Sequence, residues 1–456
     1  MERYSEKIAA FVRALKLEQI PPEVVEKAKL VFLDALGIAL ASSTMDFGLI
    51  ALDAARALGG NRESRLIGTA NKVAAANAVL ANGTLAHGLD YDDTLEGAIV
   101  HTGCCGPMTA LAVGEALGAS GKTVLEAAVA GIEVMCKIGL VAPGKFHARG
   151  FHPTALCATF GAAAAAGKLY GLEKSQWVDA FGICGSQSSG IIEYLADGTW
   201  TKRLHPGWSS HAGIIAVLFA QRGFRGPASV FEGTHGFFHA FAGDQGVHLQ
   251  RLDELGKIWE IPKLTFKTYP CGSISHPYMD CALRLRQKYA IFPERIVEVL
   301  CRTAEGPVDR LWEPLKEKQR PLSGYGAKFA LPYSIAVMLV RGKAGIAEFT
   351  DGAIRDEAVL KIADKVRYVI DSTIDYPRHL SGHVKIRLND GTLLEENQPF
   401  PRGGYELPLP AEDIEEKFHA NASLAVAREK AEEIVTAVRQ LERLAKVGSL
   451  TDLLAP

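Results

Sequence analysis

The 456-residue chain is predicted to be mainly α-helical, with an α+β domain in its second half. Two observations predict this class. Apolar residues recur at helical spacing through the first 222 residues, whereas short strand-like runs occur only after residue 290. In addition, 48% hydrophobic and 22% charged residues are typical of a globular protein that buries a large core.

Helical patterns fill the first half, and glycine or proline marks several of their ends. The expected helices are residues 5–16, 22–41, 46–58, 72–89, 106–118, 122–141, 153–170, 174–188 and 209–222. The Ala-rich run Gly161–Gly167 indicates helices that approach one another closely in a crowded all-α core.

The second half alternates strand-like and helical segments. Strands are expected at 296–302, 366–371, 384–388 and 392–396, with a hairpin turn at Asn389-Asp390-Gly391, and helices at 276–290 and 326–342. These elements predict an α+β domain over 266–403. The tail 411–447 is helical again, with Ile434, Val438, Leu441 and Leu444 on one face. If this tail returns to the first domain, residues 1–265 and 404–456 form one discontinuous helical domain.

Charge and composition limit the function classes. A net charge of −2 argues against generic nucleic-acid or membrane-surface binding. No apolar run reaches about 18 residues, so no transmembrane helix is expected. The N-terminus is charged and amphipathic and lacks the apolar core of a signal peptide, which predicts a cytoplasmic protein. Eight cysteines without a CxxC pair are expected to be buried thiols, with no iron–sulfur signature.

The richest segment for chemistry is His87–Gly103, HGLDYDDTLEGAIVHTG. It brings Asp90, Thr94 and His101 together with two further aspartates in 17 residues. Carboxylates beside histidines tune each other's pKa and can transfer protons near neutral pH. An N-capping loop with a buried histidine would have the same pattern. The rest of a calcium-loop pattern is absent, and we expect no metal.

Two basic clusters follow this segment. In Arg149-Gly-Phe-His152-Pro-Thr, the proline places His152 near a helix N-terminus, a suitable place to hold a carboxylate. Residues 197–211 contain Lys202, Arg203, His205 and His211, and their Gly, Pro and Trp residues predict a structured loop that leads into a helix. The positive charge of these side chains is expected either to bind an anionic substrate or to belong to a solvated basic loop.

Two more clusters fall in the second half. Lys267-Thr-Tyr-Pro-Cys-Gly-Ser-Ile-Ser-His276-Pro lies at the proposed domain junction, where clefts commonly form. Tyr333 begins an apolar helix, a position more typical of a core tyrosine. Residues 118–123 resemble the end of a phosphate-binding loop. That motif needs Gly at position 116, which is Ala, and a strand before the loop, where the pattern is helical. GxGxxG, GxSxG and HExxH motifs are absent.

Taken in order, the DYDDT…HTG, GFHPT, GTWTKRLHPGW and YPC…HP segments resemble the MmgE/PrpD family, which includes 2-methylcitrate dehydratase, cis-aconitate decarboxylase and iminodisuccinate epimerase. The resemblance extends from the N-terminal helices to about residue 400. It implies a large helical domain, a smaller α+β lid domain, a homodimer and no cofactor. The family's catalytic positions match Asp90, Thr94, His101, His152, Lys202, Lys267 and Tyr333.

The resemblance implies proton transfer next to a carboxylate on a small di- or tricarboxylate. We expect Lys202, Lys267 and Arg149 to bind substrate carboxylates, with His205 and His276 as further binding residues. His101 is the expected main acid/base, oriented by Asp90, while His152 acts as a donor or second proton carrier and Tyr333 protonates a leaving hydroxyl or a carbanion.

Two departures from the decarboxylase pattern bear on the reaction. Thr94 and His101 are seven residues apart rather than six, and a histidine of decarboxylase members falls at Gly272. We therefore favour a hydro-lyase that dehydrates a 2-methylcitrate-like acid. An iminodisuccinate-type epimerase, a cis-aconitate-type decarboxylase and a non-catalytic scaffold remain as alternatives.

Overall fold

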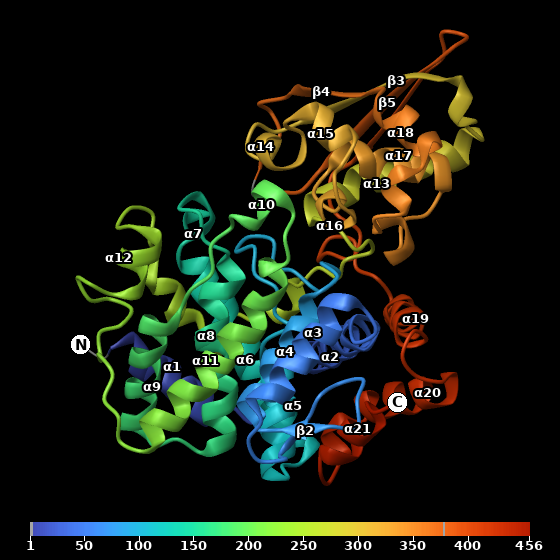
Figure 1. Cartoon of the computed structure of the whole chain (residues 1–456). Coiled ribbons are helices and arrows are strands. Elements are labelled where there is room, and N and C mark those ends of the chain that lie inside the picture. The colour runs from blue at the N-terminus through green and yellow to red at the C-terminus, as the bar shows by residue number, and fades with distance from the viewer. Residues whose placement is uncertain (1–2, 377–378) are drawn as a thin grey trace. The chain divides into compact units, whose positions relative to one another are not determined.

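The computed structural model describes residues 3–376 and 379–456, which form two compact units. The first unit contains the residues up to Ile192, Trp200–Leu264 and the residues from Pro410 onward. The second contains Glu193–Thr199 and Thr265–Leu409. Figure 1 shows helices dominating the first unit and a small sheet with helices in the second. The predicted class, mainly α with an α+β region, is confirmed.

The first unit is built from helices. They are α1 (Tyr4–Ala14), α2 (Pro22–Ser42), α3 (Asp46–Leu58), α4 (Ala75–His87), α5 (Gly106–Leu117), α6 (Gly121–Val141), α7 (Lys145–Ala148), α8 (Pro153–Tyr170), α9 (Lys174–Gln187), α11 (Thr201–Gln221), α12 (Phe237–Ala242), α19 (Ala411–Ala422), α20 (Arg428–Arg439) and α21 (Gly448–Leu453). Most predicted helices differ from their ranges by a few residues at the ends, but Lys145–Ala148 and Phe237–Ala242 were not predicted, and the helical tail expected over 411–447 is divided between two helices and a 3-10 turn. A short ribbon, β1 (Ser64–Arg65) and β2 (Lys72–Val73), precedes α4.

Small residues set the spacing of the core helices. Helices α6 and α8 cross where Gly131 faces Gly161, and a Cβ atom at Gly131 would lie 2.9 Å from the Gly161 carbonyl oxygen. The alanines that follow Gly161 are fully buried. The Ala-rich segment therefore forms the closely packed helix that its composition predicts.

Helix α11 differs from the prediction, because it begins at Thr201 rather than near residue 209. The expected loop over 197–208 is therefore wrong for most of its length, and Lys202 and His205 stand on a helix that includes Pro206. Packing explains the difference. A Cβ atom at Gly207 would lie 2.1 Å from the Leu80 carbonyl oxygen, so this glycine serves close contact with α4 rather than a turn.

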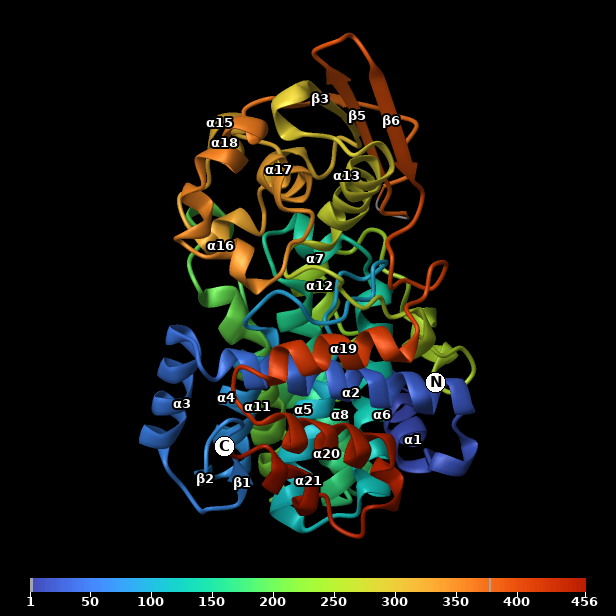
Figure 2. The same cartoon turned by 90° about the vertical axis from the view of Figure 1, so that its right-hand side faces the viewer.

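The C-terminal helices return to the first unit. Helix α19 lies along α2, as Figure 2 shows. Lys417 of α19 pairs with Asp34 of α2 at 2.7 Å and donates to the Tyr91 carbonyl oxygen at 2.7 Å. Its ammonium also stands 3.8 Å from the centre of the Tyr91 ring, at cation–π distance. The tail thus contacts the segment that follows α4.

The second unit contains a four-stranded mixed sheet with strand order β4-β3-β5-β6. The strands are β3 (Ile296–Thr303), β4 (Val366–Ile370), β5 (Gly382–Leu388) and β6 (Leu393–Gln398). β3 pairs in parallel with β4, whereas β5 pairs antiparallel with β3 and β6. The predicted strands and the hairpin that joins β5 to β6 are confirmed.

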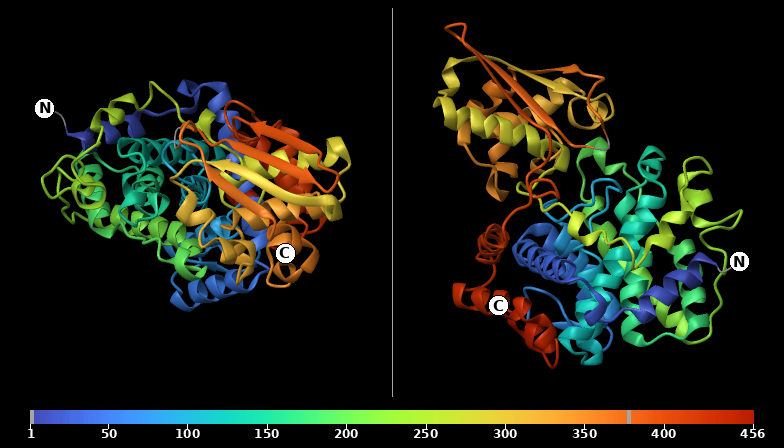
Figure 3. Two further views of the ribbon diagram at one scale, coloured as in Figure 1. Left: turned by 90° about the horizontal axis from the view of Figure 1, so that it is seen from above. Right: turned by 180° about the vertical axis from the view of Figure 1, so that it is seen from behind.

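Helices α13 (His276–Tyr289) and α17 (Leu331–Arg341) pack on this sheet, and Figure 3 shows α13 under the strands. The other helices of this unit are α10 (Tyr194–Asp197), α14 (Val308–Leu311), α15 (Leu315–Gln319), α16 (Gly324–Ala327) and α18 (Glu357–Ala363). The core of this unit joins residues of β3 and β5 to those of α13 and α17. Short 3-10 turns connect the elements of both units, as at Ile261–Lys263 before the chain enters the second unit.

A search of the described helices finds none that is by itself long and apolar enough to cross a membrane. Helices α2 and α3 together reach that length and composition, but a bend of 94° separates them.

Candidate active site

The segment between α4 and α5 is closed at its base by hydrogen bonds. Leu95 and Val100 form an antiparallel bridge. The Asp93 carboxylate accepts from the Thr102 backbone N–H at 3.0 Å, the Thr102 hydroxyl at 2.6 Å and the Gly103 N–H at 2.7 Å. Burial and the neighbouring Asp92 carboxylate raise the pKa of Asp93 to about 6, and these hydrogen bonds oppose the rise. Asp93 therefore holds the segment's two ends together.

His101 emerges at this base with one ring nitrogen fixed. Its Nδ1 lies 2.8 Å from the Asp93 carbonyl oxygen and 3.1 Å from the Thr94 hydroxyl oxygen. Because a carbonyl oxygen only accepts, Nδ1 carries the proton and Nε2 is the basic nitrogen of the neutral ring. The backbone N–H of His101 donates to the Thr154 hydroxyl at 3.1 Å. Thus Thr94 and His101 are brought together, beside the start of α8.

Lys202 and Asp90 form a buried ion pair. Lys202 Nζ lies 2.9 Å from Asp90 Oδ2, and the two side chains are 6% and 2% exposed. Asp90 adopts a left-handed backbone conformation with φ of 54°, which is uncommon for a residue other than glycine and marks functional sites. From the sequence we expect Asp90 to orient His101. In the structure, the carboxylate faces Lys202, and the Asp93 carbonyl holds the His101 ring.

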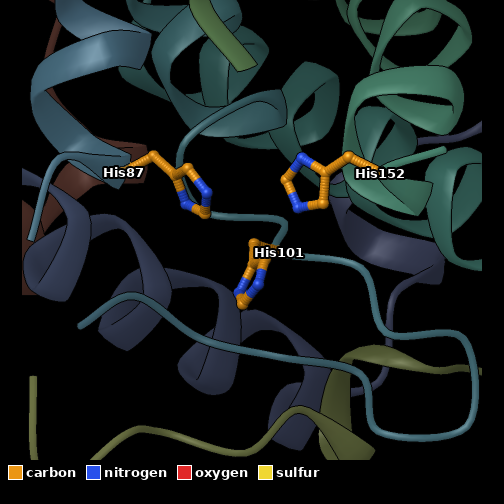
Figure 4. Close-up of side chains that lie close together, drawn as sticks. All are labelled: His87, His101 and His152. Atoms are coloured by element: carbon orange, nitrogen blue, oxygen red, sulfur yellow. The ribbon is translucent and has the colours of Figure 1, made fainter. Parts of the chain in front are cut away.

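His87, His101 and His152 form a buried cluster. Their ring centres are 4.8 Å apart for His87 and His101, 5.6 Å for His87 and His152, and 6.1 Å for His101 and His152. Figure 4 shows the His87 and His152 rings facing each other, with His101 below them. Burial lowers the pKa of His87 and sets that of His152 well below its usual value, and the Lys202 charge acts in the same direction. Both rings are therefore uncharged at neutral pH.

His205 extends the cluster from α11. Its Nδ1 lies 3.2 Å from His152 Nδ1. Burial, with the nearby Lys202 charge, lowers the pKa of His205 to about 4. Two neutral histidines thus meet nitrogen to nitrogen, one ring donating and the other accepting.

His87 belongs to this cluster but was not among the residues that the sequence singled out. Its Nδ1 lies 2.7 Å from Asp92 Oδ2, and both side chains are fully buried. The available signal was an aspartate, Asp92, five residues after the histidine that ends the Ala-rich helix. This signal was ambiguous, because Asp90 and Asp93 are also close enough in the sequence to pair with His87.

Arg149 lies at the surface of the first unit. It follows α7, is exposed, and donates to the Ala240 carbonyl oxygen at 3.3 Å. The remaining predicted residues, Lys267, His276 and Tyr333, belong to the second unit and are each about 1% exposed.

Within the second unit, the Tyr333 hydroxyl donates to the Glu348 carbonyl oxygen at 2.9 Å, and burial raises the pKa of Tyr333. His276 begins α13, and its ring centre lies 5.3 Å from that of Tyr269. A Cβ atom at Gly272 would meet no atom nearer than 3.6 Å, so this position has room for a side chain.

The geometry of the first unit suits an anion that carries acidic C–H bonds. Lys202 supplies a buried positive charge, and neutral histidines supply nitrogens that can take or give a proton. The ring nitrogens of the three histidines lie within 4.8 Å of one another, a spacing that would also admit a metal ion. The prediction of a site without metal stays untested.

The fold and this site define a two-unit protein with a buried histidine cluster in its helical unit. Residues 6–250 match the MmgE/PrpD N-terminal domain, and residues 269–443 match the MmgE/PrpD C-terminal domain. The chain therefore belongs to the MmgE/PrpD family, as the sequence motifs predict.

Curated relatives are enzymes of this family. The chain is 27% identical to the cis-aconitate decarboxylase of Mus musculus over 100% of this chain and 94% of the relative. It is 26% identical to a cis-aconitate decarboxylase-like protein of Aspergillus oryzae over 98% of this chain and 96% of the relative. A 2-methylcitrate dehydratase-like protein of A. oryzae is 27% identical over 43% of this chain and 42% of the relative.

Proposed function

We propose that this protein is a cofactor-independent lyase that removes a proton next to a carboxylate of a small di- or tricarboxylate. One observation carries the proposal: a buried cluster of histidines next to the buried Lys202–Asp90 pair in one unit. A C–H bond beside a carboxylate is weakly acidic, so a base works only if a positive charge stabilises the enediolate that forms. Lys202 supplies that charge and the histidines supply the base.

The preferred reaction is dehydration of a 2-methylcitrate-like hydroxy acid. A base takes the proton from carbon, the electron pair forms the C=C bond, and the hydroxyl leaves as water after receiving a proton from a second group. In this scheme Asp90 keeps Lys202 charged and in place, Thr94 and His101 act at the reacting carbon, and His152 is the second proton carrier. Arg149, Lys267, His205 and His276 are the proposed substrate-binding residues, and Tyr333 is the proposed proton donor to the leaving hydroxyl.

Decarboxylation of a cis-aconitate-like acid is the second candidate. It is favoured by the names of the relatives that match over nearly the whole chain. Against it stands Gly272, which lacks the side chain that decarboxylase members carry at this point. The two reactions share the need for a charge-stabilised carbon, and they differ in whether water or carbon dioxide leaves.

The experiment is a proton NMR time course in D2O with 2-methylcitrate, citrate, cis-aconitate and an iminodisuccinate-type adduct. New olefinic signals from a hydroxy acid support the dehydratase, whereas itaconate-like signals from cis-aconitate identify a decarboxylase. Deuterium entry without a new product identifies an epimerase. A protein that changes none of these acids, and whose thermal unfolding midpoint does not rise with citrate, contradicts the proposal and favours a scaffold.

The assembly and location follow as part of the same proposal. Large apolar side chains are exposed at intervals along α11, namely Leu204, Trp208 and Phe219, with Trp200 just before the helix, and we expect a homodimer. All eight cysteines are free and buried, which suits a reducing cytoplasm. Light scattering at several protein concentrations tests the dimer, and a monomer at micromolar concentration contradicts it.

A further inference from the structure

His87 and Asp92 form a dyad that the proposed mechanism has not used. Helix α4 ends at His87, and the chain turns back through Gly88, where a Cβ atom would lie 2.2 Å from the Phe47 ring. This turn brings Asp92 Oδ2 to 2.7 Å from His87 Nδ1. Because an ionised carboxylate only accepts, Nδ1 carries the proton. The dyad therefore presents His87 Nε2 as a bare, basic nitrogen.

The His87 ring lies at the centre of the histidine cluster. The ring of His87 is the one closest to both others, at 4.8 Å from His101 and 5.6 Å from His152. Nε2 is buried and accepts no hydrogen bond from the described residues. A buried basic nitrogen of this kind costs free energy unless a ligand uses it. Figure 4 shows the ring directed toward His152.

The charges around the dyad favour proton uptake by His87 over uptake by His101. Burial and the Lys202 charge lower the pKa of His87, so the ring is neutral before reaction. The Asp92 and Asp90 carboxylates act to raise this pKa. Once a proton arrives, the Asp92 carboxylate stabilises the imidazolium. His101 Nδ1 instead meets a carbonyl oxygen, and its distance to Asp92 Oδ1 is 3.9 Å. A carbonyl dipole stabilises an imidazolium less than a full negative charge does.

We propose that His87 is the base of this reaction and that Asp92 is its positioning residue. The inference rests on the proposed function. The C–H bond next to the substrate carboxylate breaks, its proton forms the N–H bond at His87 Nε2, and its electron pair stays on the substrate as the enediolate. Asp92 holds the resulting imidazolium through Nδ1–H. The leaving hydroxyl receives its proton from the second group of the proposed reaction, and a proton passing from His87 to that group restores the starting state.

The test measures deuterium entry at the substrate α-carbon in D2O for the full-length protein. His87→Gln is expected to lower the exchange rate on the order of 10²-fold or more, as expected for loss of a general base. Asp92→Asn still accepts from Nδ1–H but lacks the charge. We expect about a 10-fold loss and a shift of the acidic limb of kcat/KM to lower pH, because the imidazolium loses its stabilising carboxylate. Asp92→Glu should restore part of the rate.

The chain offers a matched control. His239 and Asp244 are also five residues apart and 2.7 Å from nitrogen to oxygen, but their side chains are 49% and 78% exposed. His239→Gln and Asp244→Asn should leave both the rate and the pH profile unchanged. Circular dichroism and the thermal unfolding midpoint of each variant show whether it is folded. If His87→Gln does not fold, Asp92→Asn, the mildest change, tests the proposal in its place.

The outcomes separate the two proposals. If the wild type exchanges no proton of any acid tested, both the proposed function and this inference fail. If the wild type exchanges and folded His87→Gln exchanges equally fast, the inference alone fails. The inference also fails if Asp92→Asn slows exchange but leaves the acidic limb of the kcat/KM pH profile at the same pH. In that case Asp92 would have a merely structural role.

Discussion

Glu133 of α6 is predicted to make the stability of this protein depend on pH. Its carboxylate is buried and accepts hydrogen bonds from the backbone N–H groups of Glu260 and Ile261 at 2.9 Å each. Burial raises the pKa of Glu133 from 4.5 to about 7, and the neighbouring Glu260 carboxylate contributes to the rise. Because the folded-state pKa exceeds the unfolded one, the protonated form stabilises the fold below pH 4.5, and this stabilisation is lost as the pH rises through 7.

The difference between the two pKa values corresponds to roughly 3 kcal/mol, at about 1.4 kcal/mol for each pKa unit. Most of it, about 2 to 3 kcal/mol, falls between pH 5 and pH 8. Glu133→Gln keeps an oxygen acceptor and cannot ionise, so the stability of the wild type relative to this variant should fall by that amount over this range. Urea unfolding of both proteins at pH 5 and pH 8 measures the change.

Glu412, exposed at the start of α19, provides the control, since Glu412→Gln should show no such difference. A wild-type stability that differs from that of Glu133→Gln by the same amount at both pH values would refute the reasoning. That result would mean that Glu133 is ionised in the folded protein throughout, with its charge compensated by the backbone and by Lys137.

Three further changes test other parts of the first unit. Gly207→Ala places a Cβ atom 2.1 Å from a backbone oxygen of α4, and we expect a loss of at least about 3 kcal/mol in unfolding free energy, measured by urea denaturation. Lys202→Met leaves a buried carboxylate without its partner, and we expect about 3–5 kcal/mol of destabilisation, together with loss of substrate-dependent exchange. Lys417→Met releases the Tyr91 carbonyl oxygen, and we expect a fall in kcat larger than the change in KM, because the segment after α4 loses a fixed point. An unchanged kcat in folded Lys417→Met would contradict this role.

Most of the fold could be predicted because local and global signals agree. Helices such as α6 and α8 combine an apolar period, a terminal glycine or proline and small residues at their crossing, and the structure has them where the pattern places them. Strands β3 to β6 were predictable from β-branched runs and the Asn389-Asp390-Gly391 turn. The start of α11 could not be predicted, because Pro206 and Gly207 are residues typical of loops. Only the structure shows that Gly207 lets α11 pack closely against α4.

The site was predictable in its members and less so in its pairings. Residue types and spacing pointed to Asp90, His101, His152 and Lys202, which the structure places in one unit. The partner of each could not be predicted, since the segment after α4 offers three aspartates within four residues. Backbone turns decide which carboxylate faces which cation, and those turns depend on contacts with α8 and α11. His87 was missed for this reason.

The closed base of the segment between α4 and α5 has a consequence for how this family varies. Asp93 and the Leu95–Val100 bridge fix both ends of the segment independently of what lies between them. An additional residue in 96–99 therefore changes only the tip, where Ile99 takes a left-handed conformation, and leaves His101 in register. A longer or shorter tip would alter what the segment touches and leave Thr94 and His101 where the closed base holds them.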